Sequence, residues 1–505
     1  MPAWPGPALG AQASRGGLIA SAALGPCPAP DNRRMTSTPA HSAQDFSALA
    51  LSPATLANLQ QLGYLHMTPI QAASLPLALQ GHDLIAQAST GSGKTAAFGL
   101  ALLARLNPRC FGVQALVLCP TRELADQVSA EIRRLARVSD NVKVVTLCGG
   151  VPLRGQAQSL SHGAHIVVGT PGRVLDHLER STLALDQLNT LVLDEADRML
   201  DMGFFNDIAT VARQCPPNRQ TLLFSATYPE GIVKLSQQFM RHPQQITVQA
   251  QHSADKIEQR WYEIQNSERL HTVGLLLEHF RPESSIAFCN TKQQCRDLVA
   301  VLQARGVSAL ALFGELEQRE RDQVLVQFAN RSCSVLVATD VAARGLDIAD
   351  LAAVINVDVT PDPEIHIHRI GRTGRGDAQG LALNLVSLDE MGSVSKIEVL
   401  QGRESQWSQV SELTPTGHGP LVPPMATIQI IGGRKEKIRA GDVLGALTGD
   451  MGYVREQVGK INVNDFSTYV AVERAIAPQV VQRLNTGRVK GKSVKARLVT
   501  DDPID

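Results

Sequence analysis

Two polar segments of the chain carry side chains that could act on a nucleoside triphosphate. The first follows an apolar run at 84–86 and comprises Ala88, Ser89, Thr90, Gly91, Ser92, Gly93, Lys94 and Thr95. The second follows an apolar run at 190–193 and comprises Asp194, Glu195, Ala196 and Asp197. A glycine-rich loop between a strand and a helix presents backbone N–H groups to phosphates, and the helix dipole favours negative charge there. We therefore expect the first segment to bind a nucleotide.

The two segments also supply the groups that phosphoryl transfer to water requires. Lys94 is expected to neutralise the β- and γ-phosphates, and the Thr95 hydroxyl to ligate Mg²⁺. Asp194 is expected to hold the same Mg²⁺, directly or through water, and Glu195 to orient or deprotonate the attacking water. We expect Lys94 and Asp194 to meet at adjacent strand ends. The alternative for 194–197 is an acidic first turn of a helix.

Length and composition indicate a globular protein of several domains. With 505 residues, 44% hydrophobic and 19% charged, the chain is too long for one core, so two to four domains are expected. No run of 18 apolar residues is present, which argues against a membrane span. The eight cysteines form no CxxC pair and several lie in apolar runs. We expect reduced, mostly buried thiols in a cytoplasmic protein.

Short apolar runs alternate with helical patterns over two long stretches. This alternation predicts two doubly wound α/β domains with parallel sheets, at 44–246 and 250–412. In the first domain the expected strands are 84–86, 115–118, 142–145, 166–168, 191–193 and 221–224. In the second they are 285–288, 310–312, 335–338, 353–356 and 381–384. The polar segment 241–256 is expected to connect the domains, and the second domain has no glycine-rich phosphate loop.

The two ends of the chain differ from these domains. Residues 1–43 are rich in Ala, Pro and Gly and are expected to be disordered. Their weakly apolar part, 18–24, is a poor signal peptide, and translation could begin at Met35. Residues 413–424 contain Pro415, Pro420, Pro423 and Pro424, which predicts a semi-rigid linker.

A small basic domain is predicted at 425–500. Its expected strands are 426–431, 458–462, 468–472 and 493–498, and its expected helices are 440–448 and 477–484. The resulting βαββαβ order is typical of an RRM-like α+β fold. Residues 424–500 carry 13 Lys and Arg against 6 Asp and Glu, although the whole chain has a formal net charge of zero. This region is therefore the part best suited to a polyanion.

Residues 46–390 resemble the DEAD-box RNA helicases. In addition to the two segments described above, Thr68-Pro69-Ile70-Gln71 after Gly63 resembles the segment with which that family reads adenine. The resemblance implies two tandem RecA-like domains that use ATP and Mg²⁺. It also implies that Gln71 binds the exposed edge of adenine, since an amide offers a donor and an acceptor, and that Phe46 stacks on the ring.

Further segments resemble the parts of the family that grip RNA. The resemblance implies RNA contacts at Pro120, Thr121, Arg122, Gly150, Thr170, Pro171, Gly172, Arg173, Asn290, Thr291, Gln318, Arg321, Thr339, Arg344 and Gly345. Hydroxyls, backbone N–H groups and arginines can hold a sugar–phosphate backbone without reading its sequence. Taken alone, each of these segments would be a turn or a helix cap, so their order along the chain carries the argument.

The second domain also resembles the family at 338–347 and 368–375. The resemblance implies that Asp347 contacts the ribose, and that Arg372 and Arg375 neutralise the charge of the phosphoryl transition state. His368 and the segment Ser225-Ala226-Thr227 would couple the nucleotide and RNA sites.

The chain departs from the family pattern at two places in the second domain. Phe313-Gly314-Glu315 stands where the family has His-Gly-Asp, and His366 stands where it has Tyr. Both departures put in doubt the fine adjustment of the expected activity. They leave the residues of the core chemistry unchanged.

Residues 427–439, 441–448 and 489–492 resemble the RNA-binding domain of the DbpA subgroup of this family. The resemblance implies binding to a hairpin of large-subunit ribosomal RNA and a role in assembling that subunit. Ser467 and Tyr469 occupy places where an RRM offers stacking aromatics, so stacking is expected to be weakened. Specificity is then expected from Arg434, Lys435, Lys437, Lys490, Lys492, Lys495 and Arg497. The alternative is a basic solvated surface without a specific ligand.

The division of groups between two domains predicts how the chain works. Closure would complete the ATP site and join two half-grooves into one RNA site, so a monomer would open short duplexes locally. Two alternatives remain open. One is an ATP-dependent clamp that grips RNA and seldom unwinds it, and the other is a DNA helicase or translocase.

Overall fold

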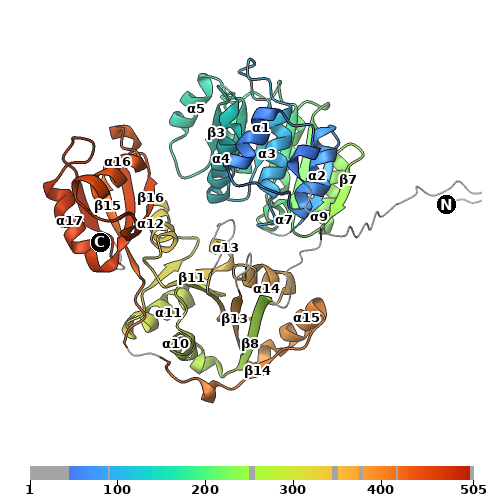
Figure 1. The fold of residues 1–505 in the computed structure, drawn as a ribbon. Helices are drawn as coiled ribbons and strands as arrows, with labels where there is room; N and C mark the ends of the chain where they lie inside the picture. Colours follow the sequence, from blue (N-terminus) through green and yellow to red (C-terminus); the bar gives the residue numbers. More distant parts are fainter. Residues whose placement is uncertain are drawn as a thin grey trace, which may run out of the picture. The chain divides into compact units, whose positions relative to one another are not determined.

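A computed structural model describes residues 45–88, 91–139, 141–248, 256–343, 351–374, 379–416 and 419–500. In these ranges the chain forms two parallel sheets of seven strands each and one antiparallel sheet of four strands (Figure 1). This architecture confirms the predicted fold class of two RecA-like domains with a small α+β domain. No helix in the described ranges is long and apolar enough to cross a membrane. The predicted disordered segment 1–43 lies outside these ranges.

The first lobe (45–248) is a doubly wound sheet with the strand order β3-β4-β2-β5-β6-β1-β7. Its strands are β1 (Leu84–Gln87), β2 (Ala115–Leu118), β3 (Val144–Leu147), β4 (Ile166–Gly169), β5 (Thr190–Leu193), β6 (Gln220–Ser225) and β7 (Gln244–Thr247). Its helices are α1 (Pro53–Gln61), α2 (Pro69–Leu79), α3 (Lys94–Ala104), α4 (Arg122–Leu135), α5 (Leu153–Ser161), α6 (Pro171–Glu179), α7 (Ala196–Asp201), α8 (Phe205–Gln214) and α9 (Glu230–Phe239).

The central strands of the first lobe are buried on both faces because helices cover both. Along β2, Leu116 belongs to one hydrophobic core and Val117 to the other. Helices α2, α3 and α4 contribute to the core of Val117, and α6, α8 and α9 to the core of Leu116. A strand between two helical layers needs apolar residues at every position, which explains the uninterrupted apolar runs in the sequence.

The second lobe (256–416) repeats this plan with the strand order β10-β11-β9-β12-β13-β8-β14. Its strands are β8 (Ile257–Glu263), β9 (Ser285–Cys289), β10 (Ala309–Leu312), β11 (Val335–Thr339), β12 (Ala353–Asn356), β13 (Gly380–Val386) and β14 (Trp407–Ser408). Its helices are α10 (Arg269–Phe280), α11 (Lys292–Ala304), α12 (Gln318–Ala329), α13 (Asp340–Ala343), α14 (Pro363–Ile370) and α15 (Met391–Gln401).

The C-terminal domain (419–500, red in Figure 1) has the predicted βαββαβ order. Its elements are β15 (Met425–Ile431), α16 (Ala440–Gly445), a π-helical turn (Ala446–Asp450), β16 (Val458–Val463), β17 (Ser467–Glu473), α17 (Ala477–Thr486) and β18 (Lys495–Leu498). The antiparallel order is β16-β17-β15-β18, and α16 and α17 pack with the strands in one hydrophobic core.

The structure corrects the sequence-based assignment at several elements. Strand β7 pairs with β1 inside the segment that we expected to be a simple connector. Three of its four residues are exposed, so it lacks the apolar run by which β1 to β6 were found. Strands β8 and β14 of the second lobe were not predicted either. Strand β3 begins at Val144, two residues later than predicted, and the helix predicted at 440–448 changes to a π-helical turn at Ala446.

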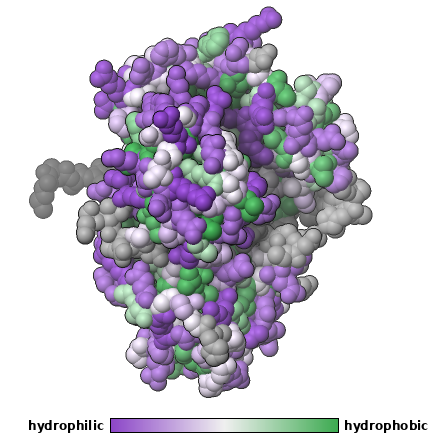
Figure 2. Space-filling model, turned by 60° about the vertical axis from the view of Figure 1, so that its left-hand side comes forward, coloured by the Kyte–Doolittle hydropathy of each residue, from purple (hydrophilic) through white to green (hydrophobic). Residues whose placement is uncertain are grey.

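The surface that Figure 2 presents is largely hydrophilic, with small hydrophobic areas scattered among polar side chains. All described cysteines lack a disulfide, and most are buried, as the sequence predicted. The apolar residues are mostly buried inside the two lobes and the C-terminal domain. Functional groups are therefore expected at strand ends and in loops.

Candidate nucleotide and RNA sites

The strand order divides the carboxyl edge of the first sheet into two halves. Strands β3, β4 and β2 are neighbours, and they are followed by the segments expected to grip RNA, at 149–150, 170–173 and 120–122. Strands β5, β6 and β1 are the next three, and they are followed by 194–197, 225–227 and the phosphate loop. Because parallel strands end at one edge, the two groups of segments lie side by side along it.

One expectation about this edge is wrong. Lys94 and Asp194 do not follow adjacent strands, because β6 lies between β1 and β5. The two groups are nevertheless close enough for Lys94 to influence the titration of Asp194. The inserted strand is the one that ends in Ser225-Ala226-Thr227, so the coupling segment stands between the two halves of the nucleotide site.

The described part of the phosphate loop is folded onto itself. Lys94 is 6% exposed, and its ammonium donates to the carbonyl of Ala88 at 2.9 Å. Gly93 has φ +92°, and a Cβ there would lie 2.5 Å from the side-chain nitrogen of Gln71. Only glycine fits this position, because the backbone is left-handed and the amide is too close. A bound phosphate would replace the Ala88 carbonyl as the partner of Lys94.

Gln71 ties the expected adenine-reading segment to this loop. Its side-chain nitrogen donates to the Gly93 carbonyl at 3.0 Å, and its side-chain oxygen accepts from the Thr68 N–H at 2.9 Å in a capping box. An amide has two donor hydrogens and two acceptor lone pairs, so one of each remains for a ligand. Phe46 is 3% exposed and meets Tyr64 edge to face, so stacking on adenine requires this ring to become accessible.

Asp194 is a buried carboxylate whose surroundings suit a bound cation. It is buried, and its Oδ1 finds no hydrogen-bond partner in the described part of the chain. Burial raises the pKa of Asp194 to about 7, although Lys94 acts in the opposite direction. A buried carboxylate oxygen without a donor is costly unless a cation or a proton satisfies it. Asp194 together with the hydroxyl of Thr95 therefore fits the hard oxygen ligands that Mg²⁺ prefers.

Glu195 is held in a strained conformation beside Asp194. It has φ +51°, which is unusual for a residue with a side chain, and it precedes α7 as its N-cap. Its carboxylate accepts from Arg198 at 2.9 Å, and both side chains are buried. Sequence reasoning gave Arg198 no role, although the i,i+3 spacing on a helix would have indicated the pair.

Asp197 joins the nucleotide side of the first lobe to the coupling segment. Its carboxylate accepts from the N–H groups of Ala226 and Thr227 at 3.1 and 2.9 Å and from the Thr227 hydroxyl at 3.0 Å. The Ser225 hydroxyl accepts from the Asp197 N–H at 3.3 Å. Burial alone would raise the pKa of Asp197, but the Thr227 N–H and Lys94 hold it below its ordinary value. Sequence reasoning assigned Asp197 no role.

Arginines join the segments of the first lobe that are expected to grip RNA. Gly150 has φ +76°, a backbone conformation that favours glycine, and it lies beside the guanidinium of Arg122. Arg173 donates to the Val151 carbonyl at 3.0 Å and to Gln156 at 2.8 Å, which links 170–173 to the same region. Thr121 caps α4, and Pro171 is the first residue of α6. The structure thus brings the three expected RNA-gripping segments together.

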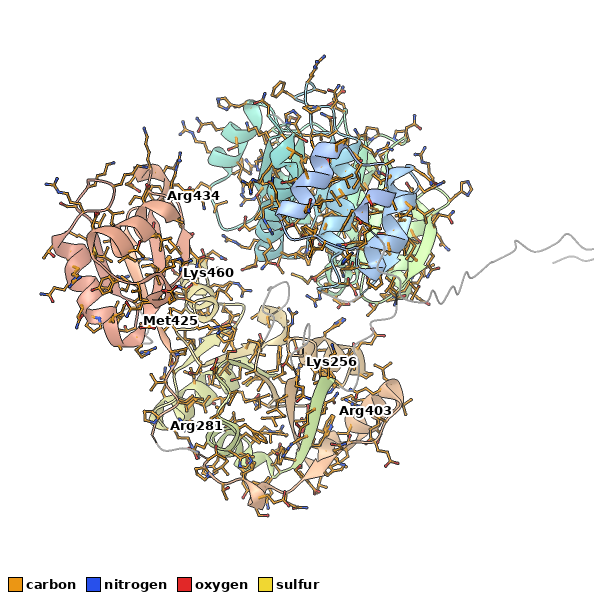
Figure 3. All side chains as sticks on the ribbon, viewed as in Figure 1. Lys256, Arg281, Arg403, Met425, Arg434 and Lys460 are labelled. Carbon is orange, nitrogen blue, oxygen red and sulfur yellow. The ribbon has the colours of Figure 1, made fainter. Side chains whose placement is uncertain are left out.

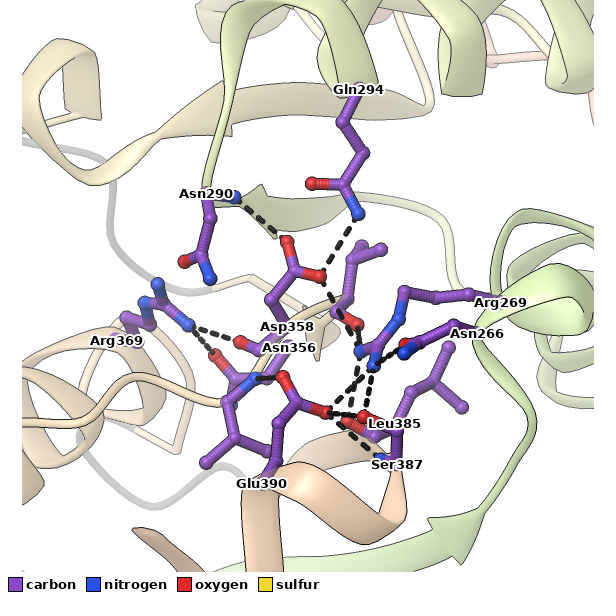
Figure 4. A network of polar contacts seen from close by, with 12 residues as sticks. Asn266, Arg269, Asn290, Gln294, Asn356, Asp358, Arg369, Leu385, Ser387 and Glu390 are labelled. Atoms are coloured by element: carbon purple, nitrogen blue, oxygen red, sulfur yellow. Dashed lines mark hydrogen bonds and ion pairs between the residues drawn. The ribbon is translucent and has the colours of Figure 1, made fainter.

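The second lobe places its expected RNA segments after β10, β11 and β9, which are again neighbours. Asp358 organises them by accepting from the Asn290 N–H at 2.8 Å and from Gln294 at 2.9 Å (Figure 4). Arg369, which is 2% exposed, donates to the Asp358 carbonyl and pairs with Asp340 at 2.6 Å. Arg369 therefore fixes the turn after Thr339 from inside the lobe.

Arg321 connects the expected RNA-gripping segments of the two lobes. Its guanidinium pairs with Glu123 of the first lobe at 2.5 Å and donates to the Ala342 carbonyl at 2.7 Å. Gln318 donates to Asp322 at 2.6 Å on the same helix. An RNA phosphate at Arg321 would have to replace Glu123 as the partner of the guanidinium. Sequence reasoning assigned no role to Glu123, which follows Arg122 in the chain.

Arg372 and His368 line a pocket of about 510 Å³ that includes Asp197, Arg198 and Thr227 of the first lobe. Arg372 is 6% exposed. Burial lowers the pKa of His368 to about 4, and the charge of Arg198 adds to this shift, so the imidazole is neutral at pH 7. The pocket is thus lined by the expected coupling residue Thr227 of the first lobe and by α14 of the second.

Several predicted site residues lie outside the described ranges. They are Ser89, Thr90, Arg344, Gly345, Asp347 and Arg375. Their roles stay predictions.

Five basic residues of the C-terminal domain lie in or beside the loop 432–437: Arg434, Lys435, Lys437, Lys490 and Lys492. Lys490 donates to the Lys437 carbonyl at 2.7 Å and to Asp442 at 3.0 Å, and Lys492 donates to the Glu436 carbonyl at 3.3 Å. Both lysines therefore hold the loop in place. Figure 3 shows Arg434 at the opposite end of the domain from Met425, where β15 begins. The loop and its supports form one basic end of the domain.

Comparisons with known proteins agree with this arrangement. Three family models match: DEAD/DEAH box helicase at 68–235, helicase conserved C-terminal domain at 265–377 and DbpA RNA binding domain at 427–498. The ATP-dependent RNA helicase DbpA of Escherichia coli K12 is 50% identical over 458 residues, which are 90% of this chain and 99% of that protein. The chain belongs to the DEAD/DEAH box helicases. This helicase is an ATP-dependent RNA helicase of the DbpA type with an added RNA-binding domain.

Other relatives match the two lobes of this helicase. The ATP-dependent RNA helicase CshA of Listeria monocytogenes is 45% identical over 354 residues, 70% of this chain and 68% of that protein. The structure of S. cerevisiae Dbp5 bound to RNA and ADP BeF3 superimposes with a TM-score of 0.67 at 30% identity, covering 73% of this chain and 97% of that one.

Proposed function

We propose that this helicase opens short RNA duplexes locally and that its C-terminal domain directs it to a hairpin of large-subunit ribosomal RNA during assembly of that subunit. The observation that carries the proposal is the basic end of the C-terminal domain, built from the loop 432–437 and its supporting lysines. The match to a DbpA RNA binding domain spans the same residues. A DbpA-type helicase would thus recognise its RNA outside the two lobes that unwind it.

The proposed chemistry divides among residues of both lobes. Lys94 and the phosphate loop bind ATP, Thr95 and Asp194 hold Mg²⁺, and Glu195 acts on the attacking water. Arg372 stabilises the charge that develops on the transferred phosphoryl group. When bound, Mg²⁺ supplies Lewis-acid stabilisation of the phosphate oxygens. The unpartnered Oδ1 of Asp194 supports the metal assignment.

Unwinding is proposed to be local because the expected RNA-gripping segments of the two lobes would hold one strand. Base pairing and stacking are worth about 1.4 kcal/mol per step by analogy with duplex DNA, so one closure can displace only a short stretch.

We propose that the protein acts as a monomer. The cysteines of the described ranges form no disulfide, which supports a reducing compartment such as the cytoplasm.

A panel of ribosomal RNA fragments tests the proposal. The ATPase rate of the purified chain should be highest with one hairpin-containing fragment, and removal of 424–505 should erase this preference while high RNA concentrations still stimulate hydrolysis. An unchanged preference after the deletion would remove the C-terminal domain from recognition.

Two comparisons separate the alternatives. Release of a short labelled strand in the presence of ATP distinguishes unwinding from clamping. A rate with single-stranded DNA equal to that with RNA would favour a DNA translocase, because the 2′-hydroxyl is the feature that distinguishes the two.

A further inference from the structure

The open face of the C-terminal sheet is not free to stack on RNA bases. Thr427, Gln429 and Tyr469 lie on this face, and each is less than 10% exposed. Thr427 accepts from Asn330 of the second lobe at 3.1 Å, and its hydroxyl lies 2.6 Å from that of Ser332. The sheet is thus occupied by the second lobe where an RRM displays its aromatics. Unpaired bases need another platform.

Phe466 is the exposed aromatic of this domain. Its side chain is 69% exposed in the short turn between β16 and β17. The turn is tied to the loop 432–437 by three backbone hydrogen bonds: Gly432 to Phe466 at 3.0 Å, Arg434 to Asn464 at 2.8 Å and Lys435 to Asp465 at 3.0 Å. The aromatic residue and the basic loop therefore form one rigid unit.

The close approach of these two segments depends on Gly433. A Cβ at Gly433 would collide with the carbonyl of Asn464, so only glycine allows the turn to lie this near to the loop. Lys490 and Lys492 support the loop from the other side through its carbonyls. A ring presented on such a support loses little conformational entropy when it binds a ligand.

The charges beside Phe466 suit phosphate groups. Arg434 is 67% exposed and lies 3.5 Å from Asp465, which is 58% exposed. Exposed ion pairs of this kind contribute little, so a phosphate can take the place of the carboxylate at low cost. Lys435 and Lys437 belong to the same loop and add positive charge.

We propose that Phe466 is a stacking platform for one unpaired RNA base, while Arg434 and Lys435 hold the neighbouring phosphates. An exposed aromatic beside cations is the combination by which proteins hold single-stranded nucleic acid. A base paired inside a helix has no free face, so the platform distinguishes a loop from its stem. The proposal rests on RNA binding by the basic end of this domain and adds the feature of the RNA that is recognised.

The test uses the full chain and two RNA probes, a stem–loop with 2-aminopurine at one loop position and a fully paired duplex of the same length. Stacking on one aromatic is worth about 1–3 kcal/mol, so Phe466→Ala should bind the stem–loop roughly 10-fold more weakly. Its affinity for the duplex should not change. The 2-aminopurine quenching seen with the wild type should disappear, and Phe466→Tyr should restore both affinity and quenching.

Val454→Ala is the matched control, because Val454 is 57% exposed in the same domain. It precedes β16, whose first residue pairs with Val472 at the end of the sheet opposite Phe466. This variant should bind both probes like the wild type. Melting curves of all variants should coincide, since these side chains are mostly in solvent.

A charge variant, Arg434→Gln with Lys435→Gln, separates the two levels of the proposal. If it weakens both probes while Phe466→Ala binds like the wild type, the basic end binds RNA and the stacking platform is refuted. If Phe466→Ala weakens both probes equally, the ring is structural and the platform is again refuted. If neither variant changes any affinity, both the platform and the proposed RNA site fail.

Discussion

Glu195 is the residue on which the proposed hydrolysis depends most directly. Glu195→Gln keeps the shape and the acceptor oxygen that Arg198 uses at 2.9 Å, so the local fold should survive. The amide cannot take a proton, so turnover should fall by about 10²- to 10⁴-fold. Steady-state ATPase assays and separate measurements of ATP and RNA binding check this, and binding should be retained. Near-normal turnover would exclude Glu195 as the base.

Arg372 is the residue of the second lobe on which the proposed hydrolysis depends. Arg372→Ala should reduce kcat by about 10³-fold, the lower end of the range for an arginine at a phosphoryl transition state. The affinity for ATP should change little, because the phosphate loop belongs to the first lobe. Arg372→Lys is the matched variant, and it should recover only part of the rate because an ammonium lacks the planar fork. A loss of ATP affinity with kcat unchanged would instead assign Arg372 to ground-state binding.

At the scale of elements, His366 links α14 to β8. Its ring is 1% exposed and stacks on Trp261 with 5.4 Å between the centroids. Burial lowers the pKa of His366 from 6.5 to about 3, with Arg369 and Arg403 adding to the shift. Between these two pKa values the unfolded chain binds more protons than the folded lobe, so stability is present above pH 6.5 and is lost as the pH falls towards 3.

His366→Tyr removes this titration and introduces the residue that is usual in the family. Each pH unit below 6.5 costs the wild type up to about 1.4 kcal/mol through this one group, and the variant should be spared that cost. Urea unfolding at pH 7.5, 6.5 and 5.5 measures the difference. The variant should lose less stability between pH 6.5 and 5.5, and parallel curves for the two proteins would contradict the argument.

The elements also show what the sequence can predict. Strands such as β2 and β12 agree with their apolar runs at every residue, because burial on both faces leaves a strong local signal. Strand β7 was missed because it is an edge strand with one buried residue. The sequence motifs identified most residues of the candidate site. They did not show that β6 lies between Lys94 and Asp194, or that Asp197 bonds to the segment after β6, because both follow from strand order. Strand order is a non-local property that no single segment encodes.

At the scale of the whole molecule, the C-terminal domain is attached to the second lobe by more than its linker. Asn330 and Ser332 are nearly fully buried and reach Thr427, and Arg474 donates to the carbonyls of Pro423 and Ser332 at 2.8 and 3.3 Å. Ser332 already donates to Gln327 at 2.8 Å, so the Thr427 hydroxyl is the donor in their contact. Removing that hydroxyl would leave two buried polar groups without this partner.

Thr427→Val keeps the volume of the side chain and removes this polar contact, at a cost of about 1–3 kcal/mol of stability. RNA held by a loosely attached domain samples more positions, so its effective concentration at the lobes falls. The affinity of the variant for stem–loop RNA should therefore be unchanged, while the ATPase stimulation by that RNA falls several-fold and stimulation by unstructured RNA does not. Thr448→Val is the control, since Thr448 donates to Leu444 at 2.9 Å within the domain. If stem–loop RNA stimulates the ATPase of both variants equally, attachment to the second lobe does not transmit RNA binding to hydrolysis.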